Sequence, residues 1–459
     1  MTKITQFEPP RTTRHRAKHD IQPDDANPEP DTAESITVGW KSRLLYDDDE
    51  SSRPSSNLAN AITAFQYAPA WSGVLAFDEN AQRIVAREAP PWDGEDSNLP
   101  FDWSDVHDIY AANWLQHQGI MVGKEIAGQA AYAVARKHPY HPIRDYLDSL
   151  EWDGRERLDY WLKTYLGADA DTVEGIPGGR LFMLVKPDIT RYTIAVGECF
   201  LISAAARIYS PGAKVDTCMV LEGGQGKLKS TALSTLFGED WFTDTLPDIR
   251  TKDAAIQLNG IWCVEIAELS AFKPVDLAHV KMFISRSTDR YRPLYGKHSV
   301  NVPRRCVFAA TTNEDSYLKD PTGGRRFWPV KTGTIDISAL KRDRDQLWAE
   351  AAAHYKDGEQ WWLDAEHEEL AAREQRDRYE THPWEPKIAE WIAGRDSVSV
   401  TEILTECLEL KSKDQKQTHK NIVASVLKSL GWTKFRDRDG EERPRRYRQI
   451  IQPGKKMSK

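Results

Sequence analysis

The chain has 459 residues, a formal net charge of -8 and 40% hydrophobic residues, which are ordinary values for a globular protein and exclude one that is basic throughout. Its length exceeds what one compact core accommodates, so we expect several folding units. Five cysteines without a C-x-x-C pair disfavour a disulfide framework and a zinc cluster, and the lack of a long apolar run or a leader-like N-terminus predicts a cytoplasmic protein that does not bind membranes.

Composition divides the chain into five segments. Residues 1–56 are rich in Pro, Asp, Arg and Thr without periodic apolar positions, so we expect a disordered tail. Residues 57–190 combine a hairpin pattern with helical spacing, which indicates an α+β accessory module. Residues 191–335 alternate short apolar runs with helical stretches, as an α/β nucleotide-binding domain does. Residues 336–382 indicate a charged helical extension, and residues 383–459 follow a proline-containing linker.

The most informative stretch is an apolar run that starts at Cys218, ends in a Gly-rich turn and is followed by a helix-compatible segment. This order is typical of a phosphate-binding loop, in which backbone N–H groups and a helix N-terminus face a phosphate. The pattern G-x-x-x-x-G-K-[ST] places Lys229 on the β- and γ-phosphates of ATP and Ser230 on Mg²⁺. The expected nucleotide-binding residues are Gly223, Gly224, Gln225, Gly226, Lys227, Leu228, Lys229, Ser230 and Thr231.

One position departs from that pattern. The glycine expected directly before the lysine is Leu228. Leucine tolerates positive φ poorly and takes up room where backbone approaches phosphate. Two interpretations stay open, namely a phosphate loop with this substitution, or an ordinary Gly-rich turn followed by a basic helix start.

A second apolar run, residues 261–268, contains two carboxylates near its end. In P-loop enzymes, an acid at the end of a neighbouring strand holds Mg²⁺ and a second acid orients the attacking water. We expect Glu268, at the end of the run, to be the catalytic acid and a metal ligand, and Glu265 is the second choice. The alternative is that these are surface glutamates at a strand end.

A third apolar run ends in Thr-Thr-Asn. An asparagine at a strand tip beside the γ-phosphate can position the lytic water, so Asn313 is a catalytic candidate, and a β-turn asparagine is the alternative. Further on, a Gly-rich approach carries Arg326 and Arg325, our candidates for a guanidinium that stabilises the phosphoryl group bound by a neighbouring subunit. Arg304 and Arg305 are weaker candidates, and a structural ion pair is the alternative for each arginine.

Between the second and third runs, the tripeptide Gly296-Lys297-His298 is typical of the tip of a β-hairpin. Lys297 and His298 can contact phosphates of a nucleic acid there, or the hairpin can be an exposed one with a solvated lysine.

The last segment predicts three helices followed by a β-hairpin, which is a winged-helix pattern. Residues 411–459 contain fifteen Lys or Arg and five Asp or Glu, a net charge of about +10 on an acidic protein. We expect this domain to bind DNA. Its candidate DNA-binding residues are Arg436, Arg438, Arg443, Arg445 and Arg446.

These motifs together resemble the virulence-associated E family, phage and mobile-element P-loop ATPases that are similar to superfamily 3 helicases. The resemblance is carried by several spaced motifs in order: Glu222-Gly-Gly-Gln-Gly with Lys229-Ser230-Thr231, Trp262-Cys-Val-Glu-Ile-Ala-Glu-Leu269, Asp289-Arg-Tyr-Arg-Pro-Leu-Tyr-Gly296, Thr312-Asn313 and Gly324-Arg-Arg-Phe-Trp-Pro329. Residues 146–154 and 209–212 also look like that family.

The resemblance implies a P-loop core of the AAA+ type, with ATP and Mg²⁺ as cofactors, and a homo-oligomeric ring, most often a hexamer, that translocates on single-stranded DNA. Carried over by position, Ser230 and Glu268 hold the metal, Asn313 is the sensor and Arg326 acts in trans. Lys297 and His298 become a DNA-gripping hairpin. Many relatives also carry a primase domain, for which the first 56 residues are too few, so a separate primase or host replication protein is an expected partner.

We therefore expect an ATP-dependent DNA helicase or replication ATPase of a phage or mobile element that acts on single-stranded and origin DNA. Two alternatives remain. One is a DNA-binding initiator whose loop has decayed at Leu228, and the other is an ATPase switch that loads a separate helicase, or acts in phage interference, without unwinding DNA.

Overall fold

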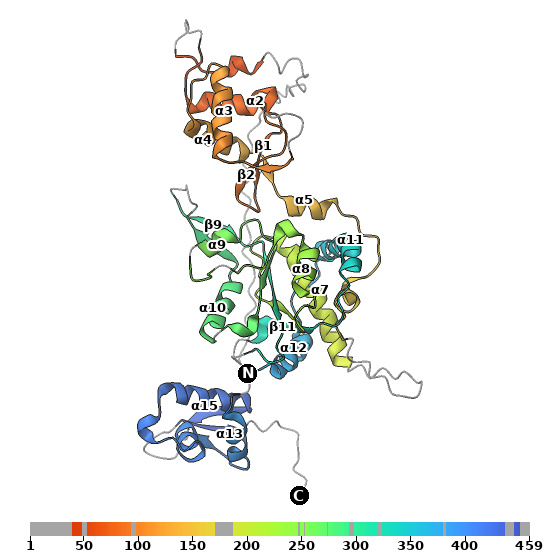
Figure 1. Ribbon diagram of the computed structural model, residues 1–459, viewed down its shortest axis with the longest axis vertical. Helices are drawn as coiled ribbons and strands as arrows, with labels where there is room; N and C mark the ends of the chain where they lie inside the picture. The colour runs from red at the N-terminus through yellow and green to blue at the C-terminus, as the bar shows by residue number, and fades with distance from the viewer. Residues whose placement is uncertain are drawn as a thin grey trace, which may run out of the picture. The chain divides into compact units, whose positions relative to one another are not determined.

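The structure is a computed structural model of the chain, and it describes residues 39–47, 53–92, 98–169, 187–246, 248–251, 253–272, 274–292, 298–318, 324–379, 382–436 and 445–449. The chain divides into two compact units (Figure 1). One consists of Met1–Phe77 and Arg83–Pro139, and the other of Asp78–Gln82 and Tyr140–Lys459. Most of the expected N-terminal tail lies outside the described residues.

The first unit contains helices α2, α3 and α4 (Figure 1) and a small sheet whose strand order is β3-β2-β1-β4. Its elements are α2 (Leu58–Tyr67), α3 (Asp105–His117), α4 (Lys124–Ala135), β1 (Leu75–Asp78), β2 (Arg83–Ala86), β3 (Phe101–Asp102) and β4 (Pro139–Tyr140). The predicted hairpin corresponds to β1 and β2. Aromatic rings fill the core, where the Trp71 ring lies 4.2 Å from that of Phe65 and 5.6 Å from that of Trp114.

The second unit begins near residue 140, earlier than the boundary expected near residue 190. Helices α5 (Pro142–Ser149), α6 (Trp161–Leu166) and α7 (Pro187–Tyr209) lie in this unit. Their buried side chains, among them Leu147 and Trp161, share one hydrophobic core with Leu221 of the central sheet. The accessory module therefore ends earlier than the sequence indicated. It also begins earlier, because Trp40 and Leu44, which we expected in a disordered tail, are buried in its core.

The centre of the second unit is a parallel five-stranded sheet with strand order β11-β5-β10-β7-β6. The strands are β5 (Cys218–Glu222), β6 (Phe242–Thr243), β7 (Cys263–Ile266), β10 (Val307–Thr312) and β11 (Phe327–Lys331). All residues of β5, β7 and β10 are buried, as expected for a parallel sheet covered on both faces. The predicted α/β architecture is confirmed.

Helices cover both faces of this sheet (Figure 1). Met219 of β5 packs in a cluster with α7, α8 (Lys229–Phe237) and α11 (Ile337–Lys356), whereas Val220 packs in a cluster with α9 (Asp253–Gln257) and α10 (Pro274–Ile284). This alternation follows the two-residue period of a strand. It places every second side chain of the central strands on the face of α8, the helix that follows the Gly-rich turn.

The segment predicted as a helical extension packs into this core. Trp348 of α11 is fully buried, its ring lies 4.1 Å from the ring of Trp262, and its Nε1 donates to the carbonyl oxygen of Leu236. The next helix, α12 (Ala365–Asp377), contributes Leu370 and Ala371 to the same cluster.

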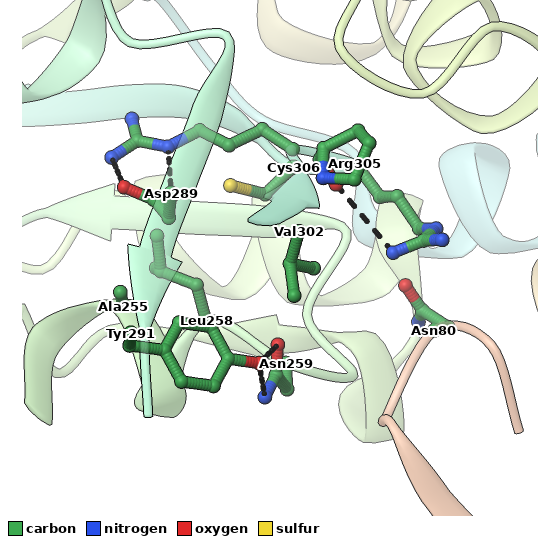
Figure 2. A pocket seen from close by; sticks show the side chains of 11 residues that line it. Asn80, Ala255, Leu258, Asn259, Asp289, Tyr291, Val302, Arg305 and Cys306 are labelled. Atoms are coloured by element: carbon green, nitrogen blue, oxygen red, sulfur yellow. Dashed lines mark hydrogen bonds and ion pairs between the residues drawn. The ribbon is translucent and has the colours of Figure 1, made fainter. Parts of the chain in front are cut away.

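A separate antiparallel pair, β8 (Thr288–Tyr291) and β9 (Val300–Pro303), forms the predicted hairpin, whose tip at residues 293–297 lies outside the described residues. The ring of Tyr291, in the pair of residues nearest the tip, is buried, and its phenol bonds to Asn259. Figure 2 shows the small cavity beside it, which is lined also by Asn80 and Arg305. Its volume of about 20 Å³ is enough for about one water molecule.

The C-terminal residues form helices and a three-stranded antiparallel sheet of order β12-β14-β13. The elements are α13 (Glu385–Ile392), β12 (Val398–Ser399), α14 (Val400–Glu402) with a π-helical continuation at Ile403–Cys407, α15 (Gln417–Ser429), β13 (Trp432–Arg436) and β14 (Arg445–Gln449). Ile388, Val423 and Trp432 are among the residues of its own core. Helices and hairpin occur in the predicted order.

In the part of the chain that the structure describes, no helix is both long and apolar enough to cross a membrane. Over the same residues, no group of three or more His, Cys, Asp or Glu side chains stands at metal-binding distance.

Candidate nucleotide site

The Gly-rich turn, residues Gly223–Leu228, connects the end of β5 to the start of α8, and we call it the phosphate loop. Gly223 has a φ of +149°, and a Cβ atom there would lie 2.8 Å from Oγ1 of Thr332, so a side chain does not fit. Gly226 has a φ of +78°. Gly224, Gln225 and Lys227 are exposed in the loop, and Thr231 is exposed in the first turn of α8. The predicted strand, loop and helix are therefore present.

Leu228 adopts the left-handed conformation that a glycine would adopt there, with φ +61° and ψ +25°. The left-handed region disfavours a non-glycine residue by about 1–2 kcal/mol, a cost that the surrounding loop bears. Half of the side chain is exposed to solvent. The substitution thus leaves the backbone turn of the loop in place.

The ammonium group of Lys229 lies at the centre of the loop. Its Nζ donates to the carbonyl oxygens of Gly223 (2.6 Å) and Gly224 (3.0 Å) and to Oδ1 of Asn313 (3.0 Å). Burial and the nearby Lys227 ammonium lower the pKa of Lys229, and the carboxylate of Glu265 opposes this effect. The structure brings Asn313 and Lys229 together although they are 84 residues apart in sequence.

Ser230 and Glu265 meet beside the loop. Oε1 of Glu265 accepts hydrogen bonds from Ser230 Oγ (2.8 Å) and from Thr311 Oγ1 (2.6 Å). Glu265 is fully buried, and among the described residues its second oxygen, Oε2, has no hydrogen-bond partner. A buried carboxylate oxygen without a partner is unfavourable unless a cation binds it. A serine hydroxyl and a carboxylate are oxygen ligands of the kind that Mg²⁺ prefers, so these residues fit that ion.

Glu268 lies elsewhere. It is exposed beyond the end of β7, with a φ of +50°, and precedes the short 3-10 turn Leu269–Ala271. No hydrogen bond joins it to Ser230 within the described residues. The strand period explains the difference, because Glu265 pairs in register with Ala309 of β10, and both lie on the face that α8 covers. The geometry favours Glu265 over our first choice, Glu268, as the metal-side carboxylate.

Arg325 and Arg326 stand at the other edge of the sheet. They belong to the short turn Gly324–Arg326, called here the arginine turn, which precedes β11. Because β11 runs parallel to β5 with Phe327 opposite Cys218, a five-residue strand, about 16 Å long, separates this turn from the phosphate loop of the same subunit. Arg326 Nε donates to Ser285 Oγ (2.8 Å), and Arg325 is exposed without a carboxylate partner in the described residues.

Arg304, a weaker candidate, has a structural role. Its guanidinium forms a buried ion pair with Asp289, with Nε 2.5 Å from Oδ2, and lies over the ring of Phe283. It is only 3% exposed and braces the base of the β8–β9 hairpin.

Only some of the predicted DNA-binding residues lie among the residues that the structure describes. Lys297, Arg438 and Arg443 lie outside the described residues, as do the side chains of Arg436 and Arg445. His298 is exposed beside β9. Arg446 is held inside its own domain, since Nη1 lies 2.7 Å from Oε1 of Glu402 and Nε donates to Ser397 Oγ. Sequence reasoning passed over five exposed lysines at and before α15, namely Lys411, Lys413, Lys416, Lys420 and Lys428.

Two further features of the site were missed. Thr311, the second donor to Glu265, precedes the asparagine in the Thr-Thr-Asn ending that the sequence singled out, and the strand period could have identified it. Glu222, directly before the loop, accepts hydrogen bonds from Arg378 and Tyr317. Arg378 is 156 residues away and stands in no motif, so the sequence offered no signal for this contact.

A protein-family model, described as the virulence-associated protein E-like domain, matches residues 147–380, which include every residue of this site. No curated protein matches the sequence. Among solved structures, the apo structure of the NrS-1 C-terminal region is similar at 11% identity with a TM-score of 0.42, over 82% of this chain and 96% of that chain. Two A-form apo structures of that region match at the same identity and coverage with TM-scores of 0.35 and 0.36.

Proposed function

This chain belongs to the family of proteins with a virulence-associated protein E-like domain, and we propose that it is an ATP-dependent DNA helicase or replication ATPase of a phage or mobile element. The observation that carries the proposal is the meeting of Lys229, Ser230, Glu265 and Asn313 at one edge of a parallel sheet. Ligand sites of open α/β sheets lie at the carboxyl ends of the strands.

Each of these groups has a task in phosphoryl transfer. The loop N–H groups and Lys229 hold the β- and γ-phosphates of ATP, and Ser230 and Glu265 hold the metal ion. Bound Mg²⁺ supplies positive charge that neutralises the phosphate oxygens. Asn313, which Lys229 already contacts, orients the attacking water. The exposed Glu268 is the carboxylate available to accept a proton from that water.

The position of the arginines supports a homo-oligomer. Arg325 and Arg326 lie at the edge of the sheet remote from their own phosphate loop, so a nucleotide that they contact belongs to another subunit. A head-to-tail interface that closes on itself generates a ring. We propose such a ring, a hexamer as in the family that the sequence resembles, with Arg325 or Arg326 completing the neighbour's site.

We propose that DNA contacts come from two places. The β8–β9 hairpin, with Lys297 and His298 near its tip, would contact single-stranded DNA, and the C-terminal domain, as a winged helix, would bind origin duplex through its basic residues. The exposed Lys411, Lys413, Lys420 and Lys428 support the second assignment, whereas the ion pair of Arg446 disfavours that residue. A separate primase or host replication protein would complete the replication machinery.

One observation favours a second function. The left-handed backbone of Leu228, a residue poorly suited to it, is compatible with slow turnover, as in an initiator or a helicase-loading ATPase switch that does not unwind DNA.

The test combines ATP hydrolysis with strand displacement on a forked duplex. A helicase hydrolyses ATP faster with single-stranded DNA and displaces a strand, and Lys229→Ala loses both activities. Turnover without displacement would favour the loading switch. DNA binding without turnover in the wild type, with turnover in Leu228→Gly, would favour an initiator with a decayed loop.

A further inference from the structure

Glu222 lies directly before the phosphate loop, and its side chain is hydrogen-bonded to the end of a helix that is distant in the sequence. It is the last residue of β5 and its side chain is 6% exposed. Its Oε1 accepts from Nε of Arg378 and from the phenol of Tyr317, each at 2.8 Å, and its Oε2 accepts from Nη2 of Arg378 at 3.0 Å. A two-pronged arginine–carboxylate contact fixes orientation as well as distance.

The backbone of Arg378 holds a second part of the site. Its carbonyl oxygen accepts from the N–H groups of Tyr317 and Leu318, each at 3.0 Å. These residues follow β10 and Asn313, the group that contacts Lys229. Arg378 thus contacts two parts of the site. Its side chain binds Glu222, directly before the phosphate loop, and its main-chain carbonyl oxygen binds the segment that follows Asn313.

The same stretch of chain also holds the arginine turn. Gln375, 5% exposed, donates from Nε2 to the carbonyl oxygen of Phe327 (2.9 Å), directly after Arg326. The phenol of Tyr379 lies against Gly324, where an added Cβ atom would be 2.1 Å from the phenol oxygen. Glycine is therefore required at the start of the arginine turn as long as Tyr379 keeps this place.

We propose that residues Gln375–Tyr379, called here the coupling turn, transmit the nucleotide state of the phosphate loop to the arginine turn of the same subunit. The inference rests on the proposed function and adds a regulation of that site. Each subunit then adjusts the arginines that it offers to its neighbour according to its own nucleotide. Glu222 and Arg378 are positioning residues in this scheme, because they contact the loop and the coupling turn and do not contact nucleotide.

A purely structural ion pair is the competing explanation, and it makes a different prediction. It stabilises the fold whether or not nucleotide is bound, so its loss lowers stability and leaves the response of the arginine turn to nucleotide unchanged. If the coupling turn transmits the nucleotide state, a ligand bound at the phosphate loop must change how readily the backbone of the arginine turn opens locally.

The test is amide hydrogen exchange of the full chain with and without a non-hydrolysable ATP analogue and Mg²⁺. Peptides that cover the phosphate loop and residues 324–330 are compared in the wild type, in the double variant Glu222→Gln/Arg378→Gln, and in Arg376→Gln. The double variant removes both charges of the pair together, so that neither Glu222 nor Arg378 is left as an unpaired charge, and Glu374 is the one carboxylate that loses its contact with Arg378. Arg376 is exposed on the same helical turn, so its variant removes one arginine from this turn without touching Glu222.

In the wild type and in Arg376→Gln, we expect the analogue to slow exchange by about threefold or more both in the loop and in residues 324–330. In the double variant, the loop is still protected and residues 324–330 no longer respond. A loop that is protected in the wild type without any response at residues 324–330 overturns the inference alone, as does an equal response in the double variant. No protection of the wild-type loop overturns the proposed function and the inference with it.

Discussion

The hydroxyl group of Ser230 donates a 2.8 Å hydrogen bond to Oε1 of Glu265. The bond joins the first turn of α8, directly after the phosphate loop, to the middle of β7, and it leaves Oε2 of the same carboxylate buried without a partner among the described residues. A cation that binds both oxygen-bearing groups would satisfy that atom. We therefore propose that Glu265, inside the strand, holds the metal ion in place of Glu268 beyond its end.

Glu265→Gln should raise the Mg²⁺ concentration needed for half-maximal ATP hydrolysis and reduce kcat by about 100-fold, because it removes the charge that holds the metal. Glu268→Gln is the matched control, and it should leave the Mg²⁺ requirement unchanged even where turnover falls. Titration of ATPase activity with Mg²⁺ checks both. A Mg²⁺ requirement raised by Glu268→Gln, and not by Glu265→Gln, would restore the assignment made from sequence.

Leu228→Gly should change the free energy of unfolding by no more than about 1 kcal/mol. Glycine removes about 1–2 kcal/mol of left-handed strain, and it offsets much of this through its larger conformational entropy in the unfolded chain, about 0.5–1 kcal/mol. Leu228→Val should be destabilising, since a β-branched residue tolerates positive φ less well than leucine. Urea unfolding of the two variants measures the contrast, and a valine variant as stable as the glycine variant would show that the φ of +61° is not maintained.

Stability should fall with rising pH through the titration of Glu198. Burial, followed by the hydrogen bond that the protonated Glu198 carboxyl donates to Asp159, raises the pKa of Glu198 to about 8 from its ordinary value of 4.5. The folded state therefore favours the protonated carboxyl, whose stabilising effect is complete below pH 4.5 and is lost as the pH rises through about 8.

Urea midpoints measured between pH 5 and pH 9 test this. Glu198→Gln should flatten the decline, because an amide keeps the hydrogen bond and does not ionise. Glu156→Gln, which removes an exposed carboxylate of the same kind, is the control and should keep the wild-type slope. The same decline in Glu198→Gln as in the wild type would assign it to another group.

Removal of Lys420 and Lys428 should weaken binding of duplex DNA uniformly across sequences. Both side chains are exposed on α15, and each phosphate contact that is lost should reduce the slope of log affinity against log salt concentration by about 0.9. Lys341→Ala, an exposed lysine on α11, is the control and should leave the slope unchanged. Arg446→Ala should instead destabilise the C-terminal domain, since it leaves Glu402 without its ion-pair partner. A salt slope unaltered by the two lysines would place the duplex elsewhere.

The core of this fold was predictable because its signals are local. The strand, loop and helix around Lys229 occupy one continuous stretch, and the apolar runs that end near Glu268 and Asn313 form strands β7 and β10. Their order in the sheet, in which β10 lies between β5 and β7, differs from their order in the chain. The choice between Glu265 and Glu268 was harder. The apolar pattern predicts that a strand is present, but it does not predict which face of that strand α8 covers. Only the sheet register, with Glu265 opposite Ala309, settles that face.

Contacts between distant segments were not predictable. The pairing of Glu222 with Arg378 joins residues 156 positions apart, and neither stands in a recognisable pattern with the other. The end of the accessory module was predicted too late in the chain for a related reason. Helices α5 and α6 have ordinary amphipathic spacing. No pattern in the neighbouring sequence indicates that the side chains of Leu147 and Trp161 pack in the same core as the central sheet.

We propose that ATP is hydrolysed between two subunits, by the phosphate loop of one and the arginine turn of the next. The most direct measurement mixes the variant Lys229→Ala with the double variant Arg325→Ala/Arg326→Ala and follows ATP hydrolysis. Each variant alone should be inactive, and an equal mixture should regain about a quarter of wild-type activity, because random assembly pairs an intact loop with intact arginines at that share of head-to-tail interfaces. A mixture that stays inactive beside an active, oligomeric wild type would contradict the shared site.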